Sequence, residues 1–296
     1  MKYSPANGSY QGKFLEKSSL INILNQYQGE NMWIIDFVTS LFSSKKPFKK
    51  YSWVRDLPDY RDFKYSPTVS GTSLPVSVDL RNTCPPVLDQ GQLGSCTANS
   101  IANAFYFDEL KQKESSAFLP SRLFIYYNER VLEGTVKQDS GAQIRDGFKT
   151  IATQGVVSEK SWSYIISKFK TKPSATLYKN ALKTKAISYH SVAQNLIDMK
   201  SCLSEGFPIV IGFSVYSSFE SNSVAQSGIV PMPSKSEQLL GGHAVLVVGY
   251  DDNTQRFLVQ NSWGTSWGQS GFFTIPYAYL TNPNLASDFW TLRTVS

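Results

Sequence analysis

The sequence predicts an α+β protein with two lobes and a cleft between them. From Cys96 to about residue 190, apolar residues recur at intervals of three and four, which is typical of helices. From about residue 207 onward, short apolar runs rich in β-branched residues indicate strands. Helices followed by strands favour a helical lobe and a sheet lobe. A Ser-, Thr-, Pro- and Gly-rich stretch at 66–73 indicates a linker, which divides the chain into an N-terminal extension (1–73) and a body (74–296).

The composition is that of an ordinary globular protein, with 41% hydrophobic and 18% charged residues. The formal charge of +6 is uneven, because residues 1–73 hold ten Lys and Arg against six Asp and Glu, and the rest hold nineteen against seventeen. Since the body is nearly neutral, the pI of about 9.0 does not indicate nucleic-acid binding. We expect a monomer with no nucleic-acid partner.

The N-terminal extension contains a predicted short helix near 15–27 and an apolar segment at 32–42, followed by a basic stretch at 45–50. We favour packing of the apolar segment on the body over attachment to a membrane surface, because its apolar part is short. The start of the sequence has no apolar h-region, so we expect no secretory signal and favour an intracellular or viral-particle location. The apolar runs are too short to cross a bilayer.

Three helices are predicted in the first lobe. The first spans 95–113 with Ser95 as its candidate N-cap, the second spans 121–132, and the third spans 144–153 and ends at Gly155. Four strands are predicted in the second lobe, at 208–215, 244–250, 257–260 and 272–275.

Cys96 lies in the first turn of the first predicted helix. There the helix dipole and the unpaired backbone N–H groups favour the thiolate, which is the form that attacks carbon. If Cys96 is a free nucleophile, Cys84 and Cys202 form at most one disulfide, and no Cys/His cluster suggests zinc. We expect no metal and no cofactor. Locally, Cys96 is either a buried small hydrophobe or a nucleophile.

The chain has two histidines with different surroundings. His190 lies among unremarkable residues and is interpreted as structural or exposed. His243 begins the predicted strand 244–250, and Asn261 follows it after 18 residues, with Trp263 close behind. An asparagine there can fix the orientation of an imidazole ring, and the tryptophan can exclude water from their hydrogen bond. His243 follows Cys96 by 147 residues, so the three residues occur in the order Cys, His, Asn.

With their local sequences, these three residues resemble the papain-like (C1) cysteine peptidases. The cysteine motif is similar to Gln90-Gly91-x-x-Gly94-Ser95-Cys96, the histidine strand to His243-Ala244-Val245…Val248-Gly249-Tyr250, and the asparagine motif to Asn261-Ser262-Trp263-Gly264…Trp267-Gly268…Gly271. The resemblance covers about residues 74–293. It implies a two-lobed fold with a helical left lobe, an antiparallel β-barrel-like right lobe and the active site in the cleft.

The resemblance implies a role for each matching residue. Cys96 attacks a peptide carbonyl, His243 acts as acid and base, and Asn261 orients His243. Gln90 and the Cys96 backbone N–H hold the oxyanion. Among the substrate-binding residues, Trp263 shields the His–Asn bond and Gly141 binds the substrate backbone. Gly242, with Ile211 and Gly241, is a candidate wall of the second subsite.

Two positions depart from the usual family pattern. Leu93 stands where the family usually has a disulfide-bonded cysteine, and Thr97 stands where it usually has tryptophan. The loss of the disulfide position fits an intracellular setting. With the long segment from Trp267 to Trp290, these departures resemble outlying members of the family in bacteria and large viruses.

The resemblance also implies a zymogen, because family members commonly carry an inhibitory propeptide at the position of residues 1–73. The hypothesis is that residues 1 to about 50 cover the cleft and inhibit intramolecularly, with the linker as a processing site. Alternatively, residues 53–59 form a permanent strand on the body. The expected partner is a peptide or protein substrate.

Two other functions remain open. The same Cys/His pair supports acyl transfer or ligation, since an amine can take the acyl group from the enzyme. A catalytically silent binding protein on a protease fold is a third interpretation, and the presence of Cys96, His243, Asn261 and Gln90 argues against it.

Overall fold

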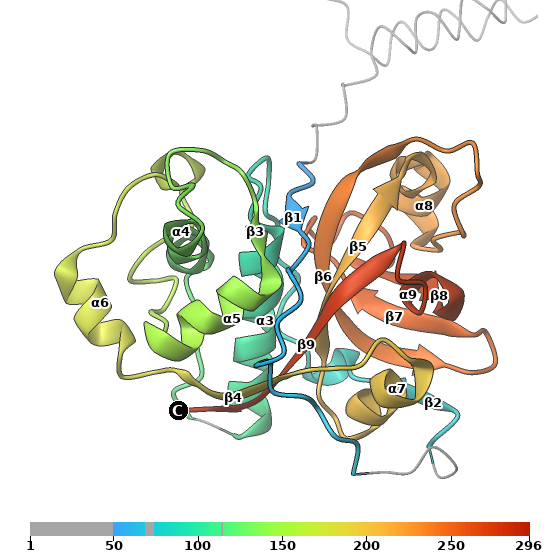
Figure 1. Ribbon diagram of the computed structural model, residues 1–296, viewed down its shortest axis with the longest axis horizontal. Helices are drawn as coiled ribbons and strands as arrows, with labels where there is room; N and C mark the ends of the chain where they lie inside the picture. The colour runs from blue at the N-terminus through green and yellow to red at the C-terminus, as the bar shows by residue number, and fades with distance from the viewer. Residues whose placement is uncertain (1–49, 69–73, 114) are drawn as a thin grey trace, which may run out of the picture. The chain divides into compact units, whose positions relative to one another are not determined.

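The structure is a computed structural model that describes residues 50–68, 74–113 and 115–296 (Figure 1). Residues 50–296 pack as one compact unit. Helices make up one lobe, in green at the left of Figure 1, and an antiparallel sheet makes up the other, in orange and red at the right. This arrangement confirms the predicted α+β fold with two lobes. The helix expected near 15–27 and the apolar segment at 32–42 lie outside the described residues.

The helical lobe is built around α3. Its helices are α3 (Cys96–Lys111), α4 (Arg122–Leu132), α5 (Ile144–Thr153) and α6 (Ala175–Ala181), with a 3-10 turn η3 (Ile166–Lys168). The first three confirm the three predicted helices, and α6 is an addition. α3 packs against α4 and α5 on one side and against the sheet on the other, which explains why almost all of its residues are buried. The start of this buried helix is therefore rigidly placed between the lobes.

The sheet lobe contains seven strands among the described residues. Along the sheet the strand order is β4-β9-β5-β6-β7-β8, and β2 pairs with β6 outside this path. The strands are β2 (Ser77–Asp79), β4 (Ala186–Ser191), β5 (Ile209–Tyr216), β6 (Leu239–Asp251), β7 (Arg256–Gln260), β8 (Phe272–Pro276) and β9 (Ala286–Val295). All neighbouring strands are antiparallel. The four predicted strands are confirmed, and β6 begins earlier than predicted, so His243 lies within it.

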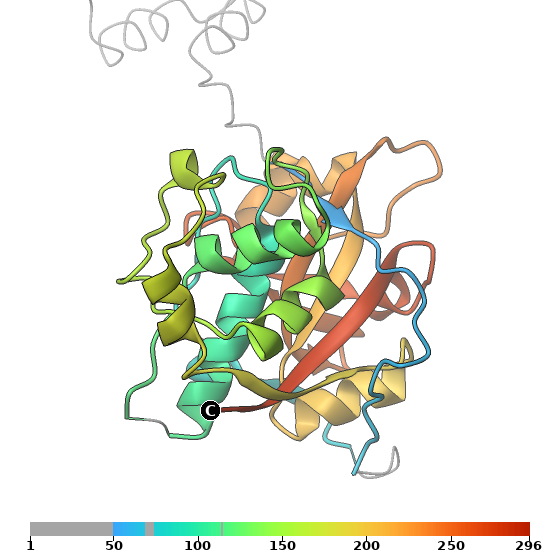
Figure 2. The same ribbon diagram turned by 60° about the vertical axis from the view of Figure 1, so that its left-hand side comes forward.

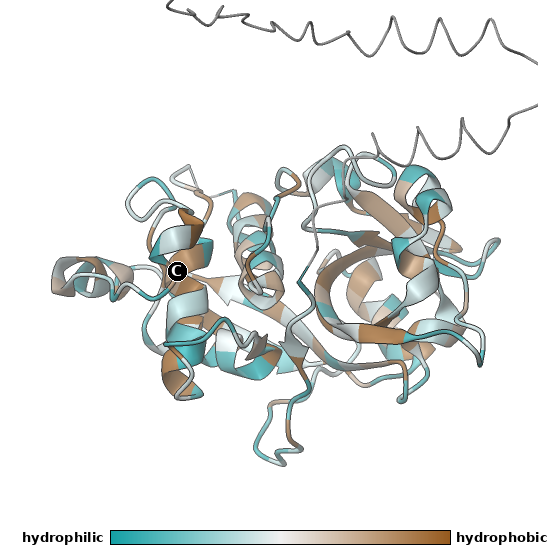
Figure 3. Ribbon diagram, turned by 90° about the horizontal axis from the view of Figure 1, so that it is seen from above, coloured by the Kyte–Doolittle hydropathy of each residue, from teal (hydrophilic) through white to brown (hydrophobic). Residues whose placement is uncertain are grey.

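The remaining elements surround the sheet. They are η2 (Arg81–Thr83), α7 (Leu196–Ser204), η4 (Ser217–Glu220), α8 (Asn222–Ser227) and α9 (Tyr277–Leu280). Figure 3 shows hydrophobic residues concentrated along the central strands of this lobe, where aromatic and aliphatic side chains form its core. His190 lies on β4, outside the cleft, with its ring 6.5 Å from that of Phe63.

The described chain begins with a segment that runs between the lobes, in blue in Figures 1 and 2. Its strand β1 (Trp53–Val54) pairs in parallel with β3 (Ala142–Gln143) of the helical lobe. Further along, Asp62 forms an ion pair with Arg145 of α5 at 2.7 Å, and the Tyr65 hydroxyl donates to Glu205 at 2.9 Å. The segment is thus attached to both lobes.

Two global features concern the cysteines and membranes. Cys84, Cys96 and Cys202 are all free thiols. Within the described ranges, we find no helix whose length and apolar character would allow it to cross a bilayer.

Candidate active site

Cys96 is the first residue of α3, and its side chain is fully buried. Ser95 occupies the N-cap position, but its hydroxyl does not cap the helix as predicted. Instead, the Ser95 Oγ lies 2.6 Å from the Tyr164 hydroxyl and accepts from Asn99 Nδ2 at 3.0 Å. The tertiary contact with Tyr164 therefore replaces the local cap and fixes the chain just before Cys96.

The loop before Cys96 is held by the helical lobe and by the loop after β7. The Gln90 backbone N–H donates to the Ser262 carbonyl at 2.9 Å, and the Tyr164 hydroxyl donates to the Gln90 carbonyl at 2.9 Å. Arg122, at the start of α4, donates to the Asp89 carbonyl at 3.0 Å. These bonds come from segments far apart in the sequence, and they fix Gln90 relative to Cys96.

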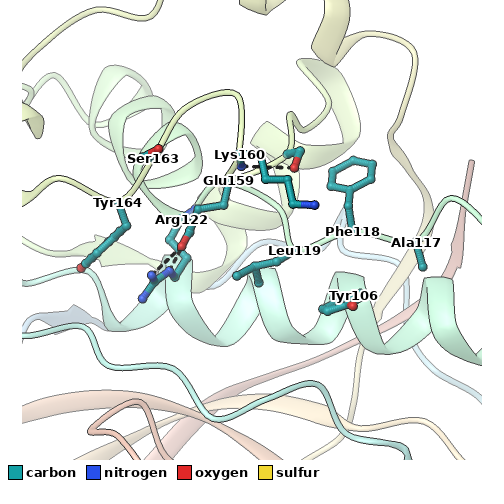
Figure 4. Close-up of a pocket in the computed structure, with 10 residues that line it drawn as sticks. Tyr106, Ala117, Phe118, Leu119, Arg122, Glu159, Lys160, Ser163 and Tyr164 are labelled. Atoms are coloured by element: carbon teal, nitrogen blue, oxygen red, sulfur yellow. Dashed lines mark hydrogen bonds and ion pairs between the residues drawn. The ribbon is translucent and has the colours of Figure 1, made fainter.

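Arg122 and Tyr164 also line a hollow of about 610 Å³ on the helical lobe (Figure 4). Arg122 forms an ion pair with Glu159 at 2.7 Å, and its guanidinium carbon lies 3.8 Å from the centre of the Tyr164 ring. The polar groups of Arg122 are thus used within the lobe. Arg122 and Tyr164 also bond to the loop at residues 89–95. We therefore interpret this wall of the hollow as a support for the loop that precedes Cys96.

His243 and Asn261 are joined by a hydrogen bond. His243 Nε2 lies 2.9 Å from Asn261 Oδ1, and both residues are buried. The Ser262 backbone N–H also donates to Asn261 Oδ1, at 2.8 Å. The ring of Trp263 stacks on the His243 ring with their centroids 5.2 Å apart and their planes 27° apart. The order Asn261-Ser262-Trp263 thus places an oxygen and an aromatic face on the same imidazole.

Cys96 and His243 are brought to the same place because α3 packs on β6. The Ala244 backbone, next to His243, makes a hydrogen bond with the Cys96 thiol. Burial raises the pKa of this thiol, and the hydrogen bonds from Ala244 and Ser52 oppose the shift. With the segment at Ser52 in place, the environment favours the neutral thiol.

Gln90 projects a donor toward the cleft. Its Oε1 accepts from the Ser262 hydroxyl at 2.7 Å, so its Nε2 must face the other way. Nε2 donates to the Leu93 carbonyl at 3.0 Å and lies 3.5 Å from the Lys50 carbonyl. Ser262 is thus the residue that orients the Gln90 amide, a role that its place in the asparagine motif did not reveal.

Residues 50–54, which we call the cleft segment, lie over Cys96. The Ser52 Oγ is 3.7 Å from the Cys96 Sγ, and the Tyr51 ring meets the His243 ring edge-on with centroids 6.1 Å apart. The Ala142 backbone N–H donates to the Ser52 carbonyl at 3.2 Å. The cleft segment therefore covers the thiol, which explains why Cys96 and His243 are inaccessible to solvent.

Glycines line the part of the cleft that this segment fills. These glycines share one property: a Cβ added to any of them would lie within 3 Å of an atom of Tyr51, Ser52 or Trp53. They are Gly94, Gly141, Gly212, Gly241 and Gly242. At Gly141 the Cβ would lie 1.6 Å from the Ser52 carbonyl oxygen. A wall without side chains allows the backbone of an extended peptide to approach closely.

The structure locates the expected substrate-binding residues and revises their neighbours. Gly141 and Gly242 both face the cleft segment. Ile211 instead packs in the core of the sheet lobe, because successive residues of a strand point to opposite faces, and Gly212 faces the cleft. Asp288 also reaches this region, where its carboxylate accepts from the Trp53 indole at 2.9 Å. The sequence around Asp288 carries no signal for this position.

Comparison with known proteins gives consistent matches. A family model described as "Papain family cysteine protease" matches residues 74–288. A peptidase C1-like protein of Acanthamoeba polyphaga mimivirus is 43% identical over 273 residues, which cover 84% of this chain and 88% of that protein.

Solved structures show the same fold. Xylellain, a cysteine protease from Xylella fastidiosa, is 45% identical with a TM-score of 0.79, and the match covers 84% of this chain and 97% of that one. Digestive procathepsin L 3 of Tenebrio molitor matches with a TM-score of 0.61 at 20% identity, over 79% of this chain and 75% of that one, and this likeness concerns the fold alone.

Proposed function

Because this chain belongs to the papain family of cysteine proteases, with relatives of the bacterial and viral type, we propose that it hydrolyses peptide bonds through Cys96, His243 and Asn261. The observation that carries this assignment is the bond of 2.9 Å between His243 and Asn261, beside a cysteine at the start of a helix. A chance arrangement of buried residues would not also stack Trp263 on the same imidazole.

The proposed reaction begins with a proton transfer from the Cys96 thiol to His243. The thiolate, favoured by the first turn of α3, attacks the peptide carbonyl and forms a tetrahedral oxyanion. The Gln90 Nε2–H and the Cys96 backbone N–H donate to this oxyanion, which typically contributes a few kcal/mol. His243 then gives its proton to the amine as the C–N bond breaks, leaving a thioester on Cys96.

Hydrolysis of the thioester completes the cycle. His243 takes a proton from water, the hydroxide attacks the thioester carbonyl, and His243 returns the proton to the Cys96 sulfur as the acid is released. Asn261 holds the imidazole in position through both halves. The acyl-transfer alternative differs only in the second half, where an amine replaces water, and excess amine added to the assay distinguishes the two.

The protein is proposed to be a zymogen in which the N-terminal extension blocks the cleft. What supports this is the position of Ser52 over the Cys96 sulfur and of the Lys50 carbonyl near the Gln90 amide. A peptide chain there leaves no room for a substrate. Residues 1–49 of the proposed propeptide lie outside the described residues.

The assignment is tested with an epoxide or vinyl-sulfone reagent that labels activated thiols. Processed wild-type protein is expected to be labelled once, at Cys96, and Cys96→Ala to remain unlabelled. Cys84→Ala and Cys202→Ala serve as controls and are expected to label as the wild type does. A processed wild-type protein that does not react would contradict the proposed function.

The zymogen proposal has a separate test. Deletion of residues 1–54 is expected to increase the rate of Cys96 labelling at neutral pH by at least about tenfold, because exposure of the thiol removes the burial that raises its pKa. If deletion changes neither labelling nor peptide hydrolysis, the extension is not inhibitory.

A further inference from the structure

The peptide group between Leu93 and Gly94, shortly before Cys96, is hydrogen-bonded at both ends. Its carbonyl accepts from Gln90 Nε2 at 3.0 Å. Its N–H donates to the carboxylate of Asp139, at 3.0 Å to Oδ1 and 3.2 Å to Oδ2. Because a peptide group is planar and rigid, its carbonyl and its N–H turn together. The bond to Asp139 at one end therefore fixes the direction of the acceptor that Gln90 meets at the other end.

Asp139 lies in the loop between α4 and β3, and a tyrosine of α4 holds its side chain. The Tyr126 hydroxyl donates to Asp139 Oδ1 at 2.5 Å and accepts from the Gly141 backbone N–H at 3.1 Å. Since the N–H of Gly141 points at the hydroxyl oxygen, the hydroxyl proton is directed to the carboxylate. Tyr126 is fully buried, so the carboxylate is attached to a rigid part of the helical lobe.

Arg130, one turn further along α4, holds the backbone of the same loop. Its guanidinium donates to the carbonyls of Val136 and Gln138 at 2.9 and 3.1 Å, and its Nε donates to the Tyr126 carbonyl at 3.0 Å. Arg130 is fully buried, where a charged group needs such hydrogen bonds. The loop that carries Asp139 is thus tied to α4 through its backbone as well as through its side chain.

The carboxylate reaches the backbone of the cysteine loop because residue 94 is a glycine. A Cβ added at Gly94 would lie 2.9 Å from Asp139 Oδ1 and 2.8 Å from Ser52 Oγ. No disulfide ties this loop to the helical lobe, since all three cysteines are free thiols. The hydrogen bond from Gly94 to Asp139 makes that link instead, across 45 positions of the sequence.

A further partner of Asp139 comes from the cleft segment. Lys50 Nζ lies 2.5 Å from Asp139 Oδ2. When the segment leaves the cleft, this ion pair is lost. The donors of Gly94 and Tyr126 belong to the body, so their bonds to the carboxylate remain. The link between the two loops therefore does not depend on the segment.

We propose that Asp139 is a positioning residue for the oxyanion site, because it holds the peptide group whose carbonyl orients the Gln90 amide. One N–H of this amide binds the Leu93 carbonyl, which leaves the other N–H for the oxyanion. The inference rests on the proposed function and adds a residue to its machinery. Ser262 fixes the amide through Oε1, and Asp139 fixes it from the Nε2 side through one peptide group.

The first test compares Asp139→Ala with the wild type in peptide hydrolysis. The full-length chains are incubated in reducing buffer, and kcat is normalised to the fraction of protein that iodoacetamide alkylates at Cys96. An interaction that acts only in the transition state lowers kcat and leaves KM unchanged. Since a hydrogen bond to a charged group typically contributes about tenfold or more, we expect kcat to fall about tenfold and KM to stay within about twofold.

The alkylation rate of Cys96 distinguishes a positioning role from a general distortion of the site. Iodoacetamide reacts at a saturated carbon and forms no oxyanion, so we expect Asp139→Ala to keep the wild-type alkylation rate within about twofold. If Asp139→Ala keeps the wild-type kcat, or if its kcat and its alkylation rate fall together, the proposal is wrong.

Two further variants test the hydrogen bond itself. Asp139→Asn retains a side-chain oxygen that can accept from the Gly94 N–H, so its kcat is expected within about threefold of the wild type. Ser140→Ala is the matched control, because the Ser140 hydroxyl donates to Thr135 Oγ1 at 2.8 Å within the same loop. Its kcat is expected within about twofold of the wild type. A loss in Ser140→Ala equal to that in Asp139→Ala would contradict the proposal.

A double-mutant cycle tests whether Asp139 acts through Gln90. If it does, Asp139→Ala lowers kcat by less than about twofold in the Gln90→Ala background, although it lowers the wild-type kcat about tenfold. Equal losses in the two backgrounds would show that Asp139 acts independently of the oxyanion donor, and would overturn the proposal.

A measurement without catalysis separates this proposal from the proposed function. Hydrogen exchange of the Gly94 amide, followed by NMR in the full-length chain, reports the bond to Asp139 directly. We expect Asp139→Ala to speed this exchange about tenfold or more and Ser140→Ala to leave it unchanged. If the wild type hydrolyses no peptide, the proposed function is wrong, and the exchange rates still decide whether Asp139 holds this peptide group. If the wild type hydrolyses peptides and Asp139→Ala changes neither kcat nor exchange, only the positioning role is wrong.

Discussion

At the residue scale, the orientation of the Gln90 amide depends on Ser262. The Ser262 hydroxyl donates to Gln90 Oε1 at 2.7 Å, which turns Nε2 toward the cleft. In Ser262→Ala we expect the amide to lose this constraint and kcat/KM to fall about tenfold, against about 10²–10³-fold for Gln90→Ala. Ser266→Ala, at an exposed position nearby, is expected to be neutral. Equal activities of the Ser262 and Ser266 variants in a peptide-hydrolysis assay would contradict this role.

Thr97 shows how one departure from the usual family pattern is accommodated. Its hydroxyl donates to Glu129 Oε2 at 2.9 Å, and both residues are fully buried. Burial raises the pKa of Glu129 well above its usual value. Because the buried carboxyl group has no access to water, it needs a hydrogen bond from another residue. We expect Thr97→Val to lower the free energy of unfolding by about 1–3 kcal/mol in urea titrations. Thr265→Val, at an exposed site, is the control, and an equal loss in both would argue against this bond.

At the scale of elements, the N-terminal segment has an exposed stretch between two anchored ends. Leu57, Tyr60 and Phe63 are 73%, 96% and 73% exposed, whereas the Asp62–Arg145 ion pair and β1 are held against the body. We expect limited proteolysis with chymotrypsin to cut first at Tyr60 or Phe63, because exposed irregular segments are the preferred sites of cleavage. Mass spectrometry identifies the first cut. A first cut in the helical lobe, with Tyr60 and Phe63 intact, would contradict the expectation.

At the scale of the whole molecule, buried carboxyls set how stability changes with pH. Burial raises the pKa values of Asp56, Asp108 and Glu133 to about 7. Between about pH 4 and 7 the folded state therefore holds protons that the unfolded state has released, so stability falls as pH rises across this window and levels off above it. We expect urea unfolding to give a lower free energy of unfolding at pH 8 than at pH 5.

Asp108 offers the clearest variant for this effect. It lies on α3, is 1% exposed, and neither of its carboxylate oxygens has a hydrogen-bond partner in the described structure. Asp108→Asn is expected to gain about 2–4 kcal/mol at pH 8 and little at pH 4, since three pH units at about 1.4 kcal/mol each are the upper bound. Asp198→Asn, at a partly exposed position, is the control. A gain that does not depend on pH would point to packing instead.

Much of the fold was predictable because its signals are local. The helix α3 has apolar residues at intervals of three and four, and the strand β6 has a continuous run of apolar, β-branched residues, and both signals are local. The strand β9 was missed because it has both charged and apolar residues, and only its pairing with β4 and β5 makes it a strand. Ser95 occupies the predicted N-cap position, but its hydroxyl does not cap the helix, because it is hydrogen-bonded to Tyr164, 69 positions away.

The sequence by itself determined which residues are candidates for chemistry: Cys96, His243, Asn261 and Gln90 each carry a recognisable local motif. Only the tertiary structure decided what surrounds them. Ser52 lies over Cys96 from 44 positions away, and Trp53 meets Asp288 across 235 positions. Such contacts leave no local pattern, because they depend on how two lobes and a connecting segment pack. The candidate site residues are thus recognisable from short motifs, whereas the accessibility of Cys96 depends on the packing around the cleft.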